Sequence, residues 1–178
     1  MGSRDASLEN ANDRRRPRPL LALAGFVLLC LIAGALGSVA TTPNIPSWYE
    51  SLNKPWFNPP NGLFPVVWTV LYLLMAVAAW LVWRGGAASS DPAAARQSQW
   101  MLVPFYLQLV LNVAWSFAFF AGHSPSGGLA VIAPLLAVIA WAMASFWQVS
   151  RLGAVLLAPY LAWVGFASLL NAAINALN

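Results

Sequence analysis

The residues best suited to chemistry in this sequence are aromatic and amide side chains at helical spacing in three apolar segments. Residues three or four apart lie on one face of a helix. The three stripes contain Phe64, Trp68, Tyr72 and Met75; Gln108, Asn112, Trp115 or Ser116, and Phe119; and Tyr160, Trp163, Ala167, Leu170, Asn171 and Ile174. Flat rings stack on flat apolar ligands, and a buried amide needs a hydrogen-bond partner. The stripes therefore indicate a site for a flat, hydrophobic molecule with a polar edge.

The same residues also allow a purely structural interpretation. Aromatic stripes often pack between helices, Gln108 and Asn112 could hydrogen-bond across helices, and Asn171 could cap the last turn. The depth of the polar groups favours a ligand. Tyr72 lies about 15 Å below the end of its helix, and Asn112 and Ala167 fall at a similar level. This match predicts a cavity in one half of a helix bundle.

The chain has few residues that could act as metal ligands or as catalytic acids and bases. The single cysteine, Cys30, excludes a disulfide within the chain, and with His123 as the single histidine a metal cluster has too few ligands. Glu50 and Asp91 are expected at opposite membrane faces and cannot act as an acid–base pair. Because no ionisable side chain is expected in mid-membrane, ion-coupled transport is disfavoured. We expect no metal and no obligatory cofactor.

The composition is that of a membrane protein. Hydrophobic residues make up 60% and charged residues 8% of the 178 residues, against about 45–50% and about 25% in soluble domains. Apolar segments long enough to cross a bilayer occur at about 20–40, 62–84, 99–121, 127–149 and 152–176. A backbone in lipid must satisfy its own hydrogen bonds, so these segments are helices. We predict an all-α bundle of five transmembrane helices over residues 20–178, after a disordered basic tail at 1–19.

The basic residues give a prediction of orientation. Every one of the 9 lysines and arginines except Lys54 falls in the N-terminal tail, near 85–98 or at 150–151. Helical bundles normally stay in the inner membrane, and in that membrane the positive-inside rule places the N-terminus in the cytoplasm. The tail arginines fit anionic lipid better than nucleic acid. The first apolar segment resembles a signal peptide but exceeds the usual core of about 7–15 residues, so we expect it to remain as a helix.

The loops differ in character. Residues 41–61 contain five prolines and four aromatic residues, and Ser47 with Glu50 forms the pattern of a capping box. We expect a short helix from Trp48 to about Asn53 within a stiff lid over the bundle. Residues 85–98 are typical of a flexible linker, and 121–128 of a turn.

Three stretches in this order resemble the TspO/translocator family of tryptophan-rich sensory proteins. They are WYESLNKPWFNPPNGLFPVVWTVLYLLMAVA at 48–78, YLQLVLNVAWSFAFF at 106–120 and APYLAWVGFASLLNAAI at 158–174. The resemblance covers about residues 20–178. It implies a five-helix bundle, usually a homodimer, that binds porphyrins, haem and hydrophobic drug-like ligands or sterols under its first loop. Some relatives are assigned to an outer membrane, so that location stays open.

The resemblance also implies a set of site residues. Positions that match the family's pocket are Trp48, Trp56, Phe64, Trp68, Tyr72, Asn112, Trp163 and Ala167. The helical stripes add Gln108, Trp115 and Asn171. Trp68 and Trp163 match tryptophans tied to light-dependent porphyrin breakdown, and they would be catalytic only if that reaction occurs. We expect a receptor or regulator that binds tetrapyrroles, with a passive transporter of porphyrins, sterols or lipids as the alternative.

Two expectations concern other partners. The sequence after the fifth segment has neither the tyrosine nor the basic residue of the cholesterol motif in vertebrate relatives, so tight cholesterol binding is not expected. Small residues could let two protomers approach closely; they are Ala33, Gly37, Ala114 and Ala118.

Overall fold

The computed structural model describes residues 19–178, and the predicted basic tail lies almost entirely outside them. Within the described residues the chain forms five helical spans, each long and apolar enough to cross a membrane. They are Pro19–Tyr49, Leu63–Ala87, Pro92–Ala121, Pro125–Trp147 and Arg151–Leu177. The predicted five-helix bundle is confirmed.

Three of these spans are interrupted helices. The first comprises α2 (Pro19–Thr41), a 3-10 turn η1 (Thr42–Asn44) and a π turn η2 (Ile45–Tyr49); the second is α3 (Leu63–Ala87). The third comprises α4 (Pro92–Met101), α5 (Val103–Ser116) and a π turn η3 (Phe117–Ala121), and the fourth is α6 (Pro125–Trp147). The fifth comprises α7 (Arg151–Leu156) and α8 (Ala158–Leu177). The breaks at Leu102 and Leu157 come two residues before Pro104 and Pro159, since a proline cannot donate to the preceding turn.

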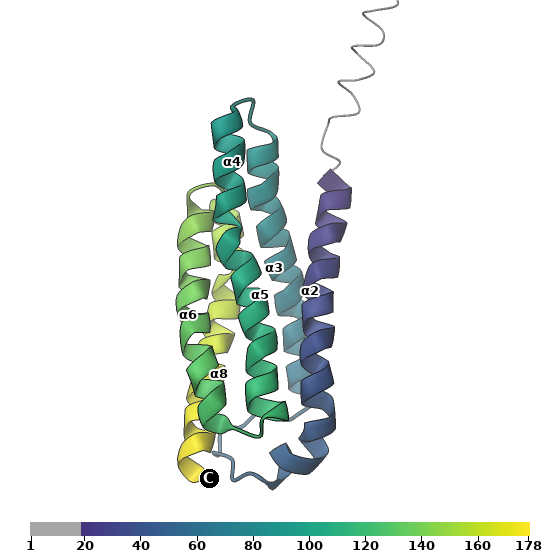
Figure 1. Cartoon of the computed structure of the whole chain (residues 1–178), viewed down its shortest axis with the longest axis vertical. Coiled ribbons are helices and arrows are strands. Elements are labelled where there is room, and N and C mark those ends of the chain that lie inside the picture. The colour runs from purple at the N-terminus through teal and green to yellow at the C-terminus, as the bar shows by residue number, and fades with distance from the viewer. Residues whose placement is uncertain (1–18) are drawn as a thin grey trace, which may run out of the picture.

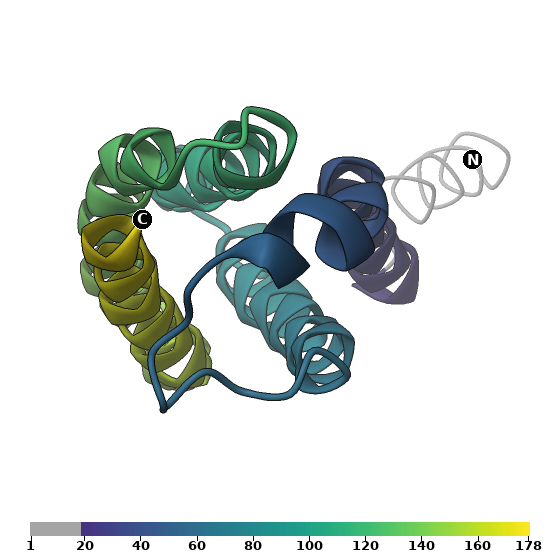
Figure 2. The same cartoon turned by 90° about the horizontal axis from the view of Figure 1, so that it is seen from below.

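The helices run side by side along the long axis of the molecule (Figure 1). Helix α2 packs against α3 and α5, α5 against α6, and α6 against α8. Viewed from the end, the segment between α2 and α3 crosses the bundle (Figure 2). We call residues 42–62 the lid. The α3–α4 hairpin forms the opposite end of the molecule.

Small residues on α2 allow close packing within one chain. A Cβ atom on Gly34 would lie 2.9 Å from the Tyr72 ring, and one on Gly37 would lie 3.0 Å from Ser116 Oγ. Ala33 is buried in the same core. Ala33 and Gly37 therefore contact the chain's own bundle, and neither is free to form the dimer contact suggested above.

Two local expectations differ from the structure. The capping box is absent, because the chain continues helically from α2 through η1 and η2, and Ser47 Oγ donates to the carbonyl of Pro43. The helical path still ends before Asn53, as expected. The 85–98 segment is mostly helical: α3 runs to Ala87 and α4 begins at Pro92, with Asp91 accepting from the Ala93 N–H at 2.9 Å. Alanine has the highest helix propensity, which outweighed the linker-like composition.

Candidate functional site

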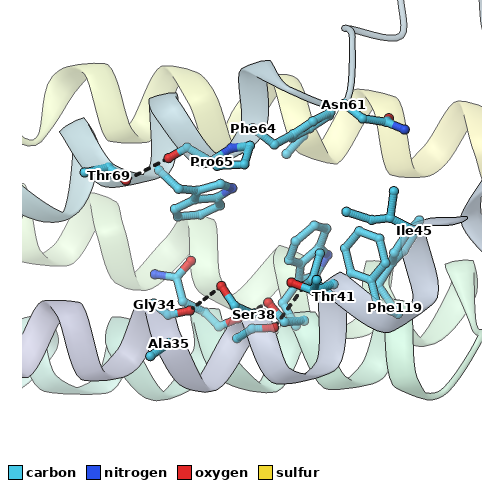
Figure 3. A pocket seen from close by; sticks show the side chains of 18 of the residues that line it. Gly34, Ala35, Ser38, Thr41, Ile45, Asn61, Phe64, Pro65, Thr69 and Phe119 are labelled. Atoms are coloured by element: carbon cyan, nitrogen blue, oxygen red, sulfur yellow. Dashed lines mark hydrogen bonds between the residues drawn. The ribbon is translucent and has the colours of Figure 1, made fainter.

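A cavity of about 350 Å³ lies beneath the lid. Helices α2, α3, α5 and α8 form its walls, and the lid closes it through Thr42, Ile45, Tyr49 and Asn61. Figure 3 shows Gly34, Ser38 and Thr41 from α2 facing Phe64, Pro65 and Thr69 from α3. The volume is at the lower end of the range of about 300–1,000 Å³ that is usual for small-molecule sites.

Aromatic rings form much of the lining. On α3, Trp68 lies 5.6 Å from Tyr72 between ring centroids, and it meets Tyr160 of α8 at 6.3 Å. Across the cavity, Trp115 is stacked on Phe119 at 5.5 Å with an interplanar angle of 19°. Because each ring is held by a neighbouring ring, the site offers fixed flat surfaces for stacking.

A single unsatisfied amide marks the polar part of the cavity. Asn112 is buried, and its Nδ2 donates to the Tyr160 hydroxyl. Its Oδ1 is buried and has no hydrogen-bond partner. A buried acceptor without a partner costs about 1–3 kcal/mol. A ligand that donates a hydrogen bond to Asn112 would remove that cost.

Asn171 also lines the cavity, but its polar atoms are already in use. Its Nδ2 donates to the carbonyl of Pro125 at 2.7 Å, and its Oδ1 accepts from Trp115 Nε1 at 3.3 Å. Gly128 is required beside it, since a Cβ there would lie 2.5 Å from Asn171 Oδ1. Asn171 therefore holds the Trp115 ring in place and joins α8 to the start of α6.

The structure brings most of the predicted site residues to one cavity. Those that line it are Phe64, Trp68, Tyr72, Asn112, Trp115, Ala167 and Asn171. Trp48 does not: it lies edge-on to Phe119 at 5.3 Å and stacks on His123 at 5.0 Å. Trp56 is 95% exposed on the lid. Their contribution to ligand binding stays a prediction.

Gln108 lies one helical turn deeper than Asn112. It is fully buried, its Nε2 is 3.6 Å from Met75 Sδ, and its Oε1 has no partner. It is not among the residues that line the cavity. Any contact between Gln108 and a ligand would require the floor of the cavity to open.

Trp163 lies on the far side of the wall between α3 and α8. It packs against Phe64 at 5.9 Å and Phe166 at 5.5 Å, and it lines an apolar groove on the outer surface with Val66 and Val70. Phe64 contacts Trp163 and also lines the cavity. In this structure Trp68 faces the cavity and Trp163 does not.

The wall contributed by α2 was not anticipated. It includes Gly34, Ser38 and Thr41, and Thr69 faces it from α3. The three hydroxyl groups each donate to a backbone carbonyl four residues earlier, at 2.8–3.0 Å, so their oxygens can still accept. The spacing of Gly34, Ser38 and Thr41 by four and three was a visible signal of a helix face.

The cavity opens sideways between α2 and α3. Ala35 and Ser38 of α2 line the cavity and are exposed on the outside, and so are Pro65 and Thr69 of α3. In a bilayer this opening would face lipid. An apolar ligand therefore has a route to the site that avoids water.

Polar contacts at two places hold the lid against the bundle. His123 Nε2 lies 2.8 Å from Asn44 Oδ1, which joins η1 to the turn between η3 and α6. At the other side, the Asn53 N–H donates to Asn178 Oδ1, and Asn178 Nδ2 donates to the Asn53 carbonyl, both at 3.0 Å. The lid is thus tied to the bundle near its start, through Asn44, and near its middle, through Asn53.

Five apolar spans around a lidded, aromatic-lined cavity define an integral, multi-pass membrane protein. The residues described hold no group of three or more histidine, cysteine or carboxylate side chains able to bind a metal.

The chain belongs to the TspO/MBR family, whose model matches residues 26–177. It is 41% identical over 162 residues to "Tryptophan-rich protein TspO" of Chlorobaculum tepidum, covering 90% of this chain and 98% of that protein. It is 34% identical over 159 residues to "Protein CrtK" of Rhodobacter capsulatus, covering 89% and 94%. It is 37% identical over 157 residues to "Translocator protein" of Bos taurus, covering 86% and 88%. The family resemblance is confirmed.

Proposed function

We propose that the protein is a membrane receptor that binds tetrapyrroles, such as protoporphyrin IX and haem, in the cavity beneath the lid. The observation that carries this proposal is the presence of paired aromatic rings in the cavity walls together with the unsatisfied Oδ1 of Asn112. Aromatic pairing contributes on the order of 1 kcal/mol per ring beyond burial. Relatives named as sensory and translocator proteins support a receptor role.

The shape of the site suggests how a porphyrin would lie. The macrocycle would stack beside Trp68 and Tyr72, with one edge at Asn112. A cavity of about 350 Å³ does not enclose the whole molecule, so the opposite edge would project between α2 and α3. The hydroxyl oxygens of Ser38 and Thr69 lie along that opening.

The lining also predicts metal-independent binding. No histidine, cysteine or methionine is among the residues that line the cavity, so haem iron would receive none of these axial ligands. The lining tyrosines, Tyr49 and Tyr72, ligate haem iron strongly only when the phenol is deprotonated. Haem and metal-free protoporphyrin IX should bind with similar affinity. Other flat, hydrophobic drug-like molecules would fit the same walls.

The test is a tryptophan-fluorescence titration of the full-length protein in nanodiscs with protoporphyrin IX, run in parallel with haem. Saturable quenching by both ligands, weakened in Trp68→Phe, supports the proposal. Quenching that never saturates, or that is identical in Trp68→Phe, would mean that porphyrin merely partitions into the lipid.

A passive transporter is the second candidate, and the opening between α2 and α3 favours it. No ionisable acid or base with a pKa near neutral lines the cavity, so movement would not be coupled to an ion gradient. Vesicles loaded with porphyrin should then release it at the same rate with or without a proton or sodium gradient. A protein that acts only as a receptor would not change the rate of release over empty vesicles.

A further inference from the structure

The cavity beneath the lid is polar in places but carries no charge. Among the described residues that line it, none is a lysine, arginine, histidine, aspartate or glutamate. The described arginines, Arg84, Arg96 and Arg151, lie toward the end of the bundle opposite the lid (Figure 1). A carboxylate taken into the cavity would therefore meet no cation among the residues of its lining. Burial of a charge without such a partner is strongly unfavourable.

Several polar groups of the lining present oxygen lone pairs rather than hydrogen-bond donors. The hydroxyls of Ser38, Thr41 and Thr69 already donate to backbone carbonyls at 2.8–3.0 Å (Figure 3). Asn112 Nδ2 donates to the Tyr160 hydroxyl, which leaves Asn112 Oδ1 as the atom without a partner. Because lone pairs repel a carboxylate, these groups favour a ligand edge that is not ionised.

The lining also contains neutral donors, such as the Tyr72 hydroxyl and the Asn61 amide. One such donor is enough to satisfy the carbonyl of an ester or an amide. An ionised carboxylate is held well only by several donors together or by a cation. The donors of the lining therefore suit a neutral carbonyl group better than a charged one.

Lys54 is the cation of the lid, and its contacts are with the lid itself. Its Nζ donates to the carbonyls of Glu50 and Leu52, both at 3.0 Å, and lies 5.1 Å from the centroid of the Tyr49 ring. Lys54 is not among the residues that line the cavity. Two of its three N–H donors are thus engaged by backbone outside the cavity.

We propose that the cavity prefers tetrapyrroles whose propionates are neutralised, as esters or amides, over the free dicarboxylates. This inference rests on the proposed tetrapyrrole site and specifies the class of ligand that the site takes. The enclosed edge of the macrocycle would meet Asn112, and the projecting edge would lie beside Ser38 and Thr69. Thr69 lies six residues after Leu63, the start of α3, which is about 9 Å along the helix. The projecting edge therefore also lies in apolar surroundings.

The experiment compares protoporphyrin IX with its dimethyl ester, by tryptophan-fluorescence titration of the full-length protein in nanodiscs near neutral pH. Each Kd is referred to the ligand concentration in the lipid, which is measured on empty nanodiscs. The ester should bind at least about tenfold more tightly, because the free acid must first be neutralised. As the pH falls toward the usual carboxyl pKa of about 4.3, the affinity of the free acid should rise toward that of the ester.

A lysine at the opening supplies the cation that the lining lacks. Ser38→Lys should narrow the ratio of the two Kd values by about fivefold, because the ammonium group can pair with a propionate. Val39→Lys is the matched control, since Val39 is exposed on the same helix but does not line the cavity, and its ratio should equal that of the parent. Saturable binding of the ester shows that each variant is folded.

Three outcomes would contradict the inference. Equal affinity for the two ligands, or tighter binding of the free acid, would overturn it and leave the tetrapyrrole site intact. A loss of free-acid affinity in Lys54→Gln would overturn it too, because Lys54 would then pair with a propionate. Failure of both ligands to saturate would refute the proposed function itself, and this inference with it.

Discussion

Replacing Asn112 and Tyr160 together should stabilise the protein and weaken ligand binding. In the parent, Asn112 Nδ2 donates to the Tyr160 hydroxyl, and Asn112 Oδ1 has no partner. Asn112→Leu removes the unsatisfied acceptor but leaves the buried Tyr160 hydroxyl without its partner. Each such group costs about 1–3 kcal/mol, so the single variant should be close to neutral. Asn112→Leu/Tyr160→Phe removes all of these groups and should raise stability by about 1–3 kcal/mol.

The affinity for protoporphyrin IX should fall in the double variant, although its stability rises. Loss of one hydrogen bond from the ligand to Asn112 is worth about 1 kcal/mol, which corresponds to about fivefold in Kd. Both quantities can be measured on the same nanodisc preparation, as the midpoint of thermal unfolding and as a fluorescence titration. For a chain of this size, 1 kcal/mol shifts Tm by about 2–4 °C.

The opposite pattern would refute this reasoning. If Asn112 only joins helices, the double variant should lose stability and bind porphyrin as the parent does. A Tm that falls by several degrees with an unchanged Kd would therefore show that the amide serves packing. Tyr160→Phe alone is the control, because it leaves Asn112 in place.

Three further predictions concern the walls and the lid. Gly34→Leu should lower Tm and reduce porphyrin affinity, because its Cβ would lie 2.9 Å from the Tyr72 ring and overpacking costs about 1–3 kcal/mol; unchanged Tm and affinity would contradict this. Asn178→Ala should speed porphyrin release by about 5- to 25-fold in stopped-flow experiments, since it removes two hydrogen bonds to the lid backbone, worth about 0.5–1 kcal/mol each; an unchanged rate would mean that the lid does not limit exit. If light-dependent porphyrin breakdown occurs, Trp68→Phe should abolish the loss of Soret absorbance while Trp163→Phe retains most of it, because only Trp68 lines the cavity; equal losses would implicate both rings.

The number of spans and the position of the cavity were predictable from the sequence. Helix length in a bilayer is set by a simple physical requirement, and the five apolar segments meet it. The level of the cavity followed from counting residues, because Tyr72, Asn112 and Ala167 all line it. Depth along a helix depends only on its rise per residue, so it can be calculated without tertiary contacts.

The direction of individual side chains was harder to predict, and so was the function of residues that could serve either packing or ligand binding. Trp163 lies at the seam between α3 and α8, where its ring packs against Phe64 and Phe166, and residue spacing does not specify that rotamer. The spacing of Asn171 along its helix predicted a contact with a ligand. Its Nδ2 instead donates to the Pro125 carbonyl at the start of α6, 46 positions away in the sequence. The α2 wall was missed because small residues such as Gly34 serve both helix packing and a cavity face.

The lid was predicted in outline but not in detail. Its prolines indicated an ordered loop, and Tyr49 indeed packs against Phe119 and Phe120. The π turns η2 and η3 insert extra residues into their spans, which changes the faces that follow. Such insertions have no marker in the hydrophobic pattern, so the contacts of Trp48 could not be derived from spacing.

The most direct test of a tetrapyrrole site beneath the lid is to fill the cavity. Ala167 lines it, and Ala172 lies on the same helix but is exposed. Protoporphyrin IX should saturate the parent and Ala172→Trp at one molecule per chain by equilibrium titration, and Ala167→Trp should bind at least about tenfold more weakly because the indole occupies the site. Equal binding by the two tryptophan variants would place the porphyrin elsewhere and contradict the proposed function.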